Sequence, residues 1–271
     1  MSSDKNPDYV LPVNQTEWAR LDEQSNGMDA LLGRLLPANV KDPKKILEIG
    51  AGGGGWAINV AKAHPGAEII AADMNPLPDR PLPSNLQYKK VNALEPFPFP
   101  AGSFDVVHAR LTMCHLIDGK KVLTRLIDLL TPGGTLLIDD INWPADFSGL
   151  DNAPGIKGGL TFVITGTKAV GGDPHFGTGL KAALDASPEL SSVDVQEVWA
   201  PLNGKDDGTP VATWGRLFRD TLTRAVEGAP GITTDAQKAT QKEFLANMAD
   251  KDLDWSYSVG FYFAVCKKKS A

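Results

Sequence analysis

Short apolar runs alternate with helical patterns over the first half of the chain. Five runs of strand length predict five strands, at residues 44–50, 69–73, 86–92, 104–109 and 135–139. Helical spacing of apolar residues predicts helices over 56–63 and 120–130. The strands are apolar throughout instead of alternating with polar residues, which is typical of a parallel sheet covered by helices on both faces.

A helical arm precedes the first strand. Asn14 is a predicted N-cap, and Glu17 three positions later gives the spacing of a capping box. An apolar face then continues to Leu36. Gly27 interrupts this face and allows a break into two pieces, and Pro37 ends the predicted helix.

The second half of the chain follows a different pattern. Residues 142–179 are rich in Gly and Pro and predict a long loop, whose aromatic side chains favour a packed lid over a flexible linker. The remaining predicted elements are a strand over 193–199, helices over 214–226 and 235–248, and a final strand over 257–266.

Composition restricts the classes of function. Hydrophobic residues make up 42% of the 271 residues and charged residues 22%, which allows a packed core. The net charge of −6 argues against a nucleic-acid partner. No apolar run reaches the roughly 18 residues of a membrane span, and the N-terminus has no signal-peptide pattern, so we expect no membrane partner. Two cysteines, and four histidines without ligand spacing, predict a cytoplasmic protein with no metal site. Nothing in the pattern specifies an oligomeric state.

A run of glycines between the first strand and the first helix is the densest chemical signal. Its glycines fit both G-x-G-x-x-G, typical of dinucleotide sites, and E-x-G-x-G-x-G, typical of S-adenosylmethionine sites. Asp73 ends the next strand and can accept hydrogen bonds from ribose hydroxyls in either case. Glu48 favours the second pattern, because a carboxylate would repel a pyrophosphate but suits a cationic sulfonium.

At this point the sequence resembles a known family, the class I S-adenosylmethionine-dependent methyltransferases, and within it the small-molecule methyltransferases of fungal secondary metabolism. The resemblance covers residues 9–141 and the final strand. The matching segments are 9–12 and 20–24 in the arm, 46–56 around the glycines, 72–76, 92–97, 104–110, 129–134 and 260–268.

The resemblance implies an α/β fold. We expect a Rossmann-like, seven-stranded, mostly parallel sheet with helices on both faces and an antiparallel last strand. The helical arm and a lid insertion are additions to this fold. We expect one domain over residues 1–271, divided into an arm (1–43), a cofactor-binding half (44–141) and a lid and substrate-side half (142–271).

The resemblance also implies S-adenosylmethionine as the cofactor. It places Asp73 at the ribose and Met74 on the adenine ring, where core packing is the alternative role for Met74. Asn92 and Ala93 would reach the adenine edge. The family more often has Asp at the position of Asn92, and an amide can still accept one hydrogen bond there.

The resemblance also places the glycine run against the cofactor. Gly50 and Gly52 would line the cofactor, and Glu48 and Ala51 are expected to be cofactor-binding residues as well. Arg110, after the fourth strand, would face the methionine end. Two roles stay open for Arg20. It is either a second partner of the cofactor carboxylate or a surface charge paired with Glu23.

Methyl transfer to a hydroxyl needs a base, and transfer to an amine or thiol needs little help. His115 is the best-placed candidate, His175 in the predicted lid is second and Asp140 is third. His108 lies within a strand and is expected to orient a neighbour. A structural role stays open for each of these residues. Cys114 suggests a thiol nucleophile, but no other residue supports covalent chemistry.

Aromatic residues in the second half predict an apolar pocket and a small apolar or aromatic acceptor: Trp143, Phe147, Phe162, Phe176 and Trp214. The acceptor atom, whether O, N or S, is left open. Two other functions compete with methyl transfer. One is a regulatory protein that binds S-adenosylmethionine without transferring methyl groups, and the other is a nicotinamide-dependent oxidoreductase.

Overall fold

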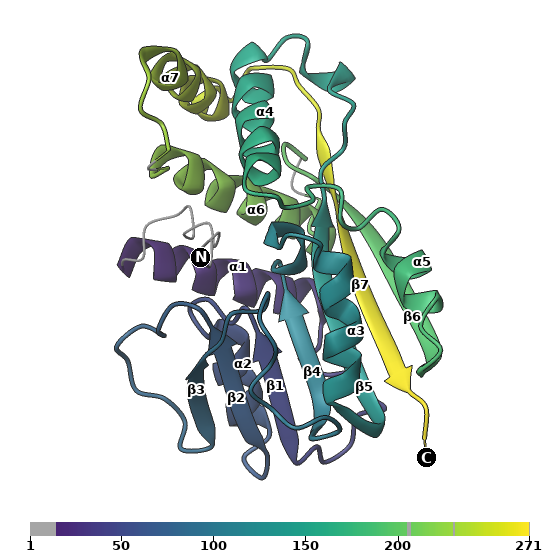
Figure 1. Ribbon diagram of the computed structural model, residues 1–271. Helices are drawn as coiled ribbons and strands as arrows, with labels where there is room; N and C mark the ends of the chain where they lie inside the picture. The colour runs from purple at the N-terminus through teal and green to yellow at the C-terminus, as the bar shows by residue number, and fades with distance from the viewer. Residues whose placement is uncertain (1–14, 205–206, 230, 271) are drawn as a thin grey trace, which may run out of the picture.

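A computed structural model describes residues 15–204, 207–229 and 231–270. Its centre is a seven-stranded sheet of order β3-β2-β1-β4-β5-β7-β6 (Figure 1). The strands are β1 (Lys45–Ile49), β2 (Glu68–Asp73), β3 (Leu86–Lys90), β4 (Phe104–Arg110), β5 (Leu130–Asn142), β6 (Leu190–Pro201) and β7 (Ser258–Lys268). The first five strands pair in parallel, and β7 runs antiparallel to both of its neighbours. The predicted Rossmann-like sheet with an antiparallel last strand is therefore confirmed.

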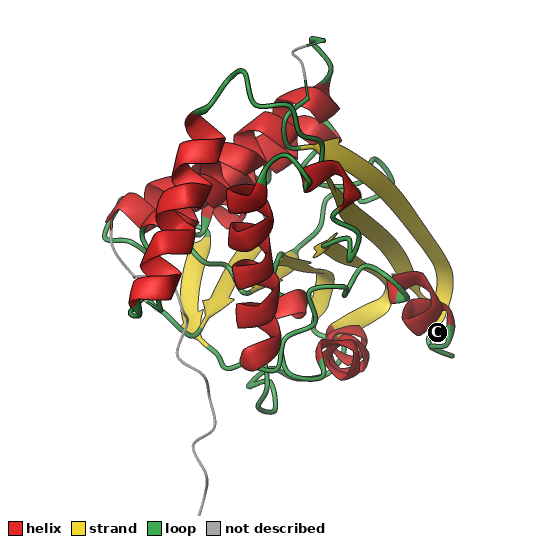
Figure 2. Cartoon of the chain, turned by 90° about the horizontal axis from the view of Figure 1, so that it is seen from above, coloured by secondary structure: helices red, strands yellow, loops and turns green. Residues whose placement is uncertain are grey.

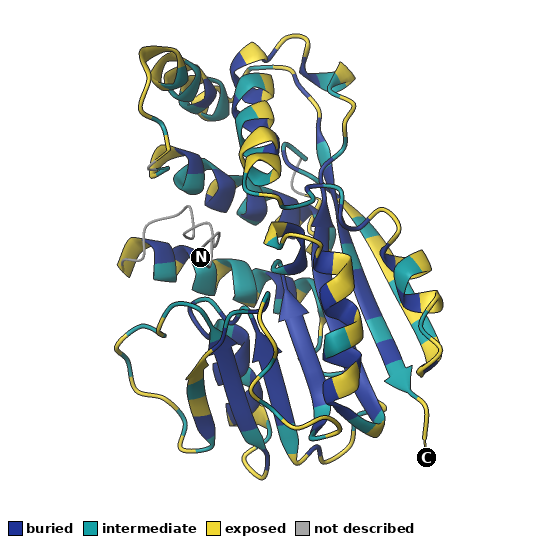
Figure 3. Ribbon diagram, viewed as in Figure 1, coloured by how far each residue is buried: buried dark blue, intermediate teal, exposed yellow. Residues whose placement is uncertain are grey.

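Helices cover both faces of the sheet, as Figure 2 shows from above. Alternate residues of β1 belong to separate apolar clusters, because successive side chains of a strand point to opposite faces. Ile46 belongs to the cluster that contains residues of α2 (Gly55–Ala63), and Leu47 belongs to the cluster that contains residues of α3 (Gly119–Leu129). The strands between these layers are largely buried (Figure 3).

The helical arm is one helix, α1 (Gln15–Leu32), with no break at Gly27. A Cβ at Gly27 would come within 3.0–3.1 Å of Leu217 and Trp214, so this glycine allows α1 to lie close to α6 (Pro210–Glu227). The helix ends at Leu32, before Pro37, and Gly33 follows with a φ of +63°. Asn14, the predicted N-cap, lies outside the described residues.

The predicted long loop over 142–179 is wrong in its central part. It contains α4 (Pro154–Ala169), which packs against α7 (Asp235–Ala249). The glycines that suggested a loop are used for this packing instead: a Cβ at Gly155 would overlap the backbone of Glu243, and a Cβ at Gly159 would overlap the ring of Phe244. Contacts between helices thus override low intrinsic helix propensity.

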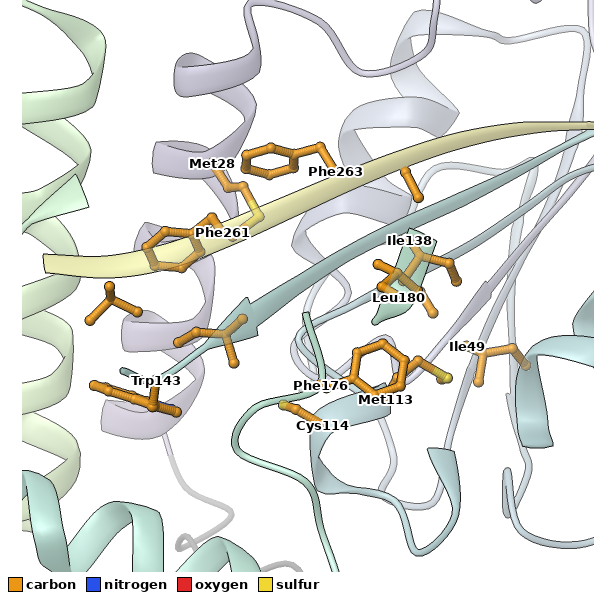
Figure 4. Packing of buried hydrophobic residues seen from close by; sticks show 14 of the residues in the cluster. Met28, Ile49, Met113, Cys114, Ile138, Trp143, Phe176, Leu180, Phe261 and Phe263 are labelled. Carbon is orange, nitrogen blue, oxygen red and sulfur yellow. The ribbon is translucent and has the colours of Figure 1, made fainter. Parts of the chain in front are cut away.

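Other elements extend beyond their predicted ends. The strand predicted at 135–139 is the centre of the longer β5, and a short helix α5 (Leu180–Asp185) was not predicted. The apolar core joins the arm to the sheet, since Met28 of α1 lies beside Phe261 and Phe263 of β7 (Figure 4). Among the described residues, no helix combines the length and apolarity that crossing a membrane requires.

Candidate active site

A cleft of about 390 Å³ lies at the carboxyl ends of the parallel strands. In Figure 1, α1 lies across these strand ends, between the sheet and the helices α4, α6 and α7. One side of the cleft is formed by the loops that follow β1, β2, β3 and β4. The other side is formed by the end of β5 and by α4 and α6. This is the edge at which α/β sheets generally bind their ligands.

The glycine run forms the turn between β1 and α2. Gly50, Gly52 and Gly54 have φ values of +72°, +53° and +77°, which side chains rarely adopt. A Cβ at Gly50 would overlap the side chain of Thr112, in the turn after β4. Thr112 was not predicted as a site residue, although it also lines the cleft. The glycines thus bring bare backbone to the cleft, as a cofactor-binding loop requires.

Asp73 fixes this turn as well as facing the cleft. Its Oδ2 accepts a hydrogen bond from the Gly52 amide at 2.8 Å, and its Oδ1 accepts one from the Asn75 amide at 2.8 Å. Each carboxylate oxygen has a second lone pair. Asp73 can therefore hold the glycine turn and still accept hydrogen bonds from ribose hydroxyls.

The loops after β2 and β3 line the same side of the cleft. Met74, Asn92 and Ala93 all contribute to its wall. The Asn92 side-chain oxygen accepts a hydrogen bond from the Leu94 amide at 3.0 Å. An adenine could be placed beside these residues, and the Asn92 carbonyl would then serve two partners.

Arg110 and Glu48 belong to a charge network, which we define as Glu48, His108, Asp139, Arg110 and Asp29. Asp29 is half-buried and the other four residues are buried. The Arg110 guanidinium contacts Asp139 at 2.9 Å and Asp29 of α1 at 2.8 Å. Arg110 was predicted to face the cofactor, and it does line the cleft, but both carboxylates already bind it. Burial would lower the pKa of Arg110, and the two carboxylates outweigh burial and raise it.

Arg20 lies on α1 and lines the cleft. Its guanidinium is bound by Glu17 through two hydrogen bonds of 2.8 and 2.6 Å. The alternative pairing with Glu23 is wrong, because Glu23 contacts Arg224 of α6 instead. Helix spacing allows either pair, since Glu17 and Glu23 both lie three residues from Arg20, and the contact of Glu23 with α6 leaves Glu17 as the partner.

His115 is in a short turn, η1 (Met113–His115), that follows β4. It lines the cleft, and its side chain is exposed within the cleft wall. Surrounding protein and the nearby Arg20 charge lower the pKa of His115 below its usual value. The imidazole is therefore neutral at neutral pH, the form that a general base needs.

The part of the cleft that is lined by the end of β5, by α4 and by α6 is largely apolar. We call it the acceptor chamber, and its apolar lining residues are Ile141, Trp143, Val163, Val170, Phe218, Leu222 and Ala225. Of the five aromatic residues predicted to line a pocket, Trp143 does so. The prediction is wrong for the others: Phe147 stacks on Tyr257, Phe162 lies on the α7 side of α4, and Phe176 and Trp214 are buried in the core.

Comparison with known proteins gives consistent matches. A family model described as a methyltransferase domain matches residues 20–157. Methyltransferase str2 of Strobilurus tenacellus is 51% identical over 99% of this chain and 98% of its own length, and methyltransferase str3 of the same organism is 46% identical over 96% of each. Phosphoethanolamine N-methyltransferase 2 of Haemonchus contortus, solved with S-adenosyl-L-methionine, has a TM-score of 0.52 at 17% identity, covering 98% of this chain and 55% of that one.

The chain belongs to the methyltransferase-domain family. The predicted family and the predicted methyl-transfer activity are thereby confirmed, and the nicotinamide interpretation of the glycine run is not favoured.

Two further candidate bases of this methyltransferase lie outside the cleft. The His175 Nδ1 donates to the Trp143 carbonyl at 2.5 Å, and His175 is not among the residues that line the cleft. Asp140 is fully buried and accepts hydrogen bonds from the amides of Met113 and Ile141, both at 2.9 Å. Burial raises the pKa of Asp140 to about 6. Their hydrogen bonds stabilise the backbone around the cleft. Because neither side chain lines the cleft, neither can contact an acceptor there.

Cys114 lines the cleft but is a poor nucleophile. Burial and the nearby Asp140 raise its pKa well above the usual value, so the thiol is not ionised. The residues that the sequence analysis missed are on α4 and α6, chiefly Val163, Phe218 and Leu222. The apolar face of the predicted helix over 214–226 was a usable signal for the last two, but no pattern indicated that α4 would form.

Proposed function

We propose that this methyltransferase transfers the methyl group of S-adenosylmethionine to a small apolar or aromatic metabolite. The observation that carries the proposal is the composition of the cleft. Bare glycine backbone and Asp73 line one side, and the apolar acceptor chamber lines the other. One continuous cleft of this kind can hold donor and acceptor next to each other.

The residues on the cofactor side fit the cofactor. Gly50 and Gly52 lack the Cβ atoms that would narrow the cleft, Asp73 offers acceptor oxygens to ribose hydroxyls, and Met74, Asn92 and Ala93 offer an apolar and amide edge to adenine. Glu48 supplies negative charge beside the glycine backbone, and Arg20 or Arg110 is the nearest cation for a carboxylate. Bound S-adenosylmethionine would supply a methyl group already activated on a sulfonium sulfur.

The chain's own task is then alignment and proton removal. The acceptor chamber excludes water and orients the acceptor, and this positioning supplies much of the rate of a displacement. His115 lines the same cleft and is neutral at neutral pH, so it can take a proton from an acceptor hydroxyl through its imidazole nitrogen. A phenol or another acidic hydroxyl is therefore the acceptor that uses this residue best.

The resemblance of the cofactor-side motifs to the small-molecule methyltransferases of fungal secondary metabolism supports such a role, in keeping with an acceptor of low molecular mass. We place the protein in the cytoplasm, because both cysteines are buried and unpaired in the part of the chain that the structure describes. We also retain the division into an arm, a cofactor half and an acceptor half, because the cleft is lined by all three.

Calorimetric titration tests the proposal. S-adenosylhomocysteine should bind to the protein and NADH should not. Gly52→Val should abolish binding, because it places a branched side chain where the cofactor meets backbone. Gly33→Val is the matched control, since Gly33 also has a positive φ, of +63°, and nothing lies within 4 Å of a Cβ at that position. Binding of NADH alone, or normal binding of S-adenosylhomocysteine to Gly52→Val, would exclude the proposed cofactor site.

A further inference from the structure

The turn that carries His115 has a fixed place in the wall of the cleft. It is the three-residue helix η1, which follows β4. Its first two side chains, Met113 and Cys114, are buried in the core that also contains Phe176, as Figure 4 shows. The third side chain, His115, is exposed and lines the cleft. The position of η1 therefore decides where the His115 imidazole lies.

Asp140, near the end of β5, is fully buried and binds this turn. Its Oδ2 accepts hydrogen bonds from the amides of Met113 at 2.9 Å and Cys114 at 3.3 Å, and the carboxylate also accepts one from the Cys114 thiol. Its Oδ1 accepts one from the Ile141 amide at 2.9 Å. Three of these four hydrogen bonds thus join Asp140 to η1, and amides bind an ionised carboxylate more strongly than a neutral acceptor.

The backbone on both sides of η1 is strained. Leu111 and Asp118 have φ values of +46° and +53°, and they are two of the three non-glycine residues with positive φ in the part of the chain that the structure describes. Residues with a Cβ atom keep this conformation only where the surrounding structure holds them, and such residues gather at functional sites. Two backbone hydrogen bonds add to the support: the Leu111 amide donates to the Asp139 carbonyl at 2.7 Å, and the Asp173 amide donates to the Cys114 carbonyl at 2.8 Å. A strained turn moves when a support is removed, so each of these contacts matters for its position.

We propose that Asp140 is a positioning residue, which holds η1 so that the His115 imidazole faces the acceptor. This inference rests on the proposed function, in which His115 removes the acceptor proton. Asp140 does not line the cleft, so it acts through the backbone of η1 and not on the reacting atoms. A displacement of about 1 Å can lower a rate about 10²-fold, so a general base needs a support of this kind.

NMR tests this role without an acceptor. The imidazole signal of each of the four histidines is followed against pH, and His115→Gln identifies the signal of His115. In the native protein His115 should titrate below about pH 6.5, because the surrounding protein and the Arg20 charge lower its pKa. Asp140→Ala should return the pKa of His115 toward about 6.5, because a loosened η1 carries the imidazole out of these surroundings. The signal of His64, at the end of α2, should not change between the two proteins. A folded Asp140→Ala protein with the native titration of His115 would overturn the inference.

A double-mutant cycle tests the role in turnover, on a phenol that the native protein methylates. Asp140→Ala should lower kcat about 10- to 100-fold, while S-adenosylhomocysteine binds with nearly unchanged affinity. In a His115→Ala background the same substitution should lower kcat no further, because no base is left to position. An equal loss in both backgrounds would overturn the inference, since Asp140 would then act only through the general stability of the fold.

Two variants separate positioning from folding. Asp140→Asn keeps one oxygen that can accept from the amides of η1, so it should regain most of the lost kcat. Asp105→Ala is the matched control, because Asp105 also accepts hydrogen bonds from two successive amides, those of Lys44 and Lys45, but does not line the cleft. It should keep the native kcat. A loss of kcat in Asp105→Ala as large as that in Asp140→Ala would contradict a positioning role.

If Asp140→Ala does not fold, Gly119→Ala displaces the same turn without altering Asp140. A Cβ at Gly119 would lie 2.3 Å from the Met113 carbonyl oxygen, whereas a Cβ at Gly66 meets nothing within 4 Å, so Gly66→Ala is the control. Gly119→Ala should reproduce the shift in the pKa of His115 and the loss of kcat. A folded Gly119→Ala protein with the native pKa of His115 and the native kcat would overturn the inference. Failure of the proposed function looks different, because the native protein would then bind no S-adenosylhomocysteine.

Discussion

Asp73 connects the cofactor side of the cleft to the turn that shapes it. Asp73→Ala should weaken the binding of S-adenosylhomocysteine by about 2–3 kcal/mol, because the ribose hydroxyls lose an ionised acceptor and the Gly52 amide loses its partner. Calorimetry measures the loss. Asp105→Ala is the matched control: Asp105 also binds two amides, those of Lys44 and Lys45, but it does not line the cleft. Equal losses in both variants would show that Asp73 acts only through folding.

His115 is the residue through which the mechanism can be tested. If the acceptor is a hydroxyl, His115→Ala should lower kcat by roughly 10²–10⁴ with cofactor affinity nearly unchanged. Because the surrounding protein and the Arg20 charge lower the pKa of His115 below its usual value of about 6.5, the native rate should stay constant as pH falls to about 6.5 and decline only below it. Steady-state rates between acid and neutral pH provide the measurement.

His175→Ala is the control for that experiment. His175 does not line the cleft, so the variant should keep its kcat, although it loses the hydrogen bond to Trp143. Loss of turnover in His175→Ala but not in His115→Ala would show that His175 is the general base and His115 is not. An acceptor amine would leave both variants active, because alignment then determines the rate.

For single residues, the sequence predicted those roles that depend on neighbours close in the chain, and it missed contacts between residues far apart in the chain. The glycine turn and Asp73 could be placed because strand, turn and strand are local patterns with a fixed chemical purpose. The partners of Arg110 could not, since Asp29 is 81 residues away and meets it only because α1 crosses the sheet. The pairing of Arg20 was misjudged because Glu17 and Glu23 both lie three positions away on the same helix.

The element that departs most from its sequence pattern is α4. Its glycines divide into two kinds: Gly159 faces Phe244 of α7, and Gly166 has nothing within 4 Å of a Cβ. Gly166→Ala should stabilise the fold by about 0.5–1 kcal/mol, because alanine has the higher helix propensity. Gly159→Ala should destabilise it despite the same gain in propensity, because the new methyl group overlaps the ring.

Thermal or denaturant unfolding of the two variants checks this difference. Stabilisation by Gly159→Ala would contradict the close packing of α4 on α7.

The two glycines also explain why a loop was predicted here. Glycine content is a local signal, and the tertiary contact that makes glycine necessary is not visible in the sequence. The strands were easier to predict, because burial on both faces leaves a continuous apolar run.

On the scale of the whole molecule, the cleft lies between elements from two halves of the chain. The cofactor side comes from loops that follow β1 to β4, and the acceptor chamber comes from β5, α4 and α6. When cofactor and acceptor are both bound, amide hydrogen exchange should slow in α4 and α6 as well as in the glycine turn. Mass-spectrometric exchange on the free and the doubly bound protein provides the comparison. Unchanged exchange in α4 and α6 would place the acceptor elsewhere.

The central claim is that the acceptor chamber binds the molecule that is methylated. The most direct measurement incubates the protein with S-adenosylmethionine and a panel of phenols, amines, acids and thiols, and detects by mass spectrometry any compound that gains one methyl group. We expect a small apolar or aromatic compound to be methylated. Ala225→Phe fills the chamber and should abolish methylation of this compound, while the binding of S-adenosylhomocysteine stays unchanged. Ala169→Phe, at an exposed position of α4, is the control and should leave methylation unchanged. Full methylation by Ala225→Phe, or binding of the cofactor with no methylated compound in the panel, would contradict the account.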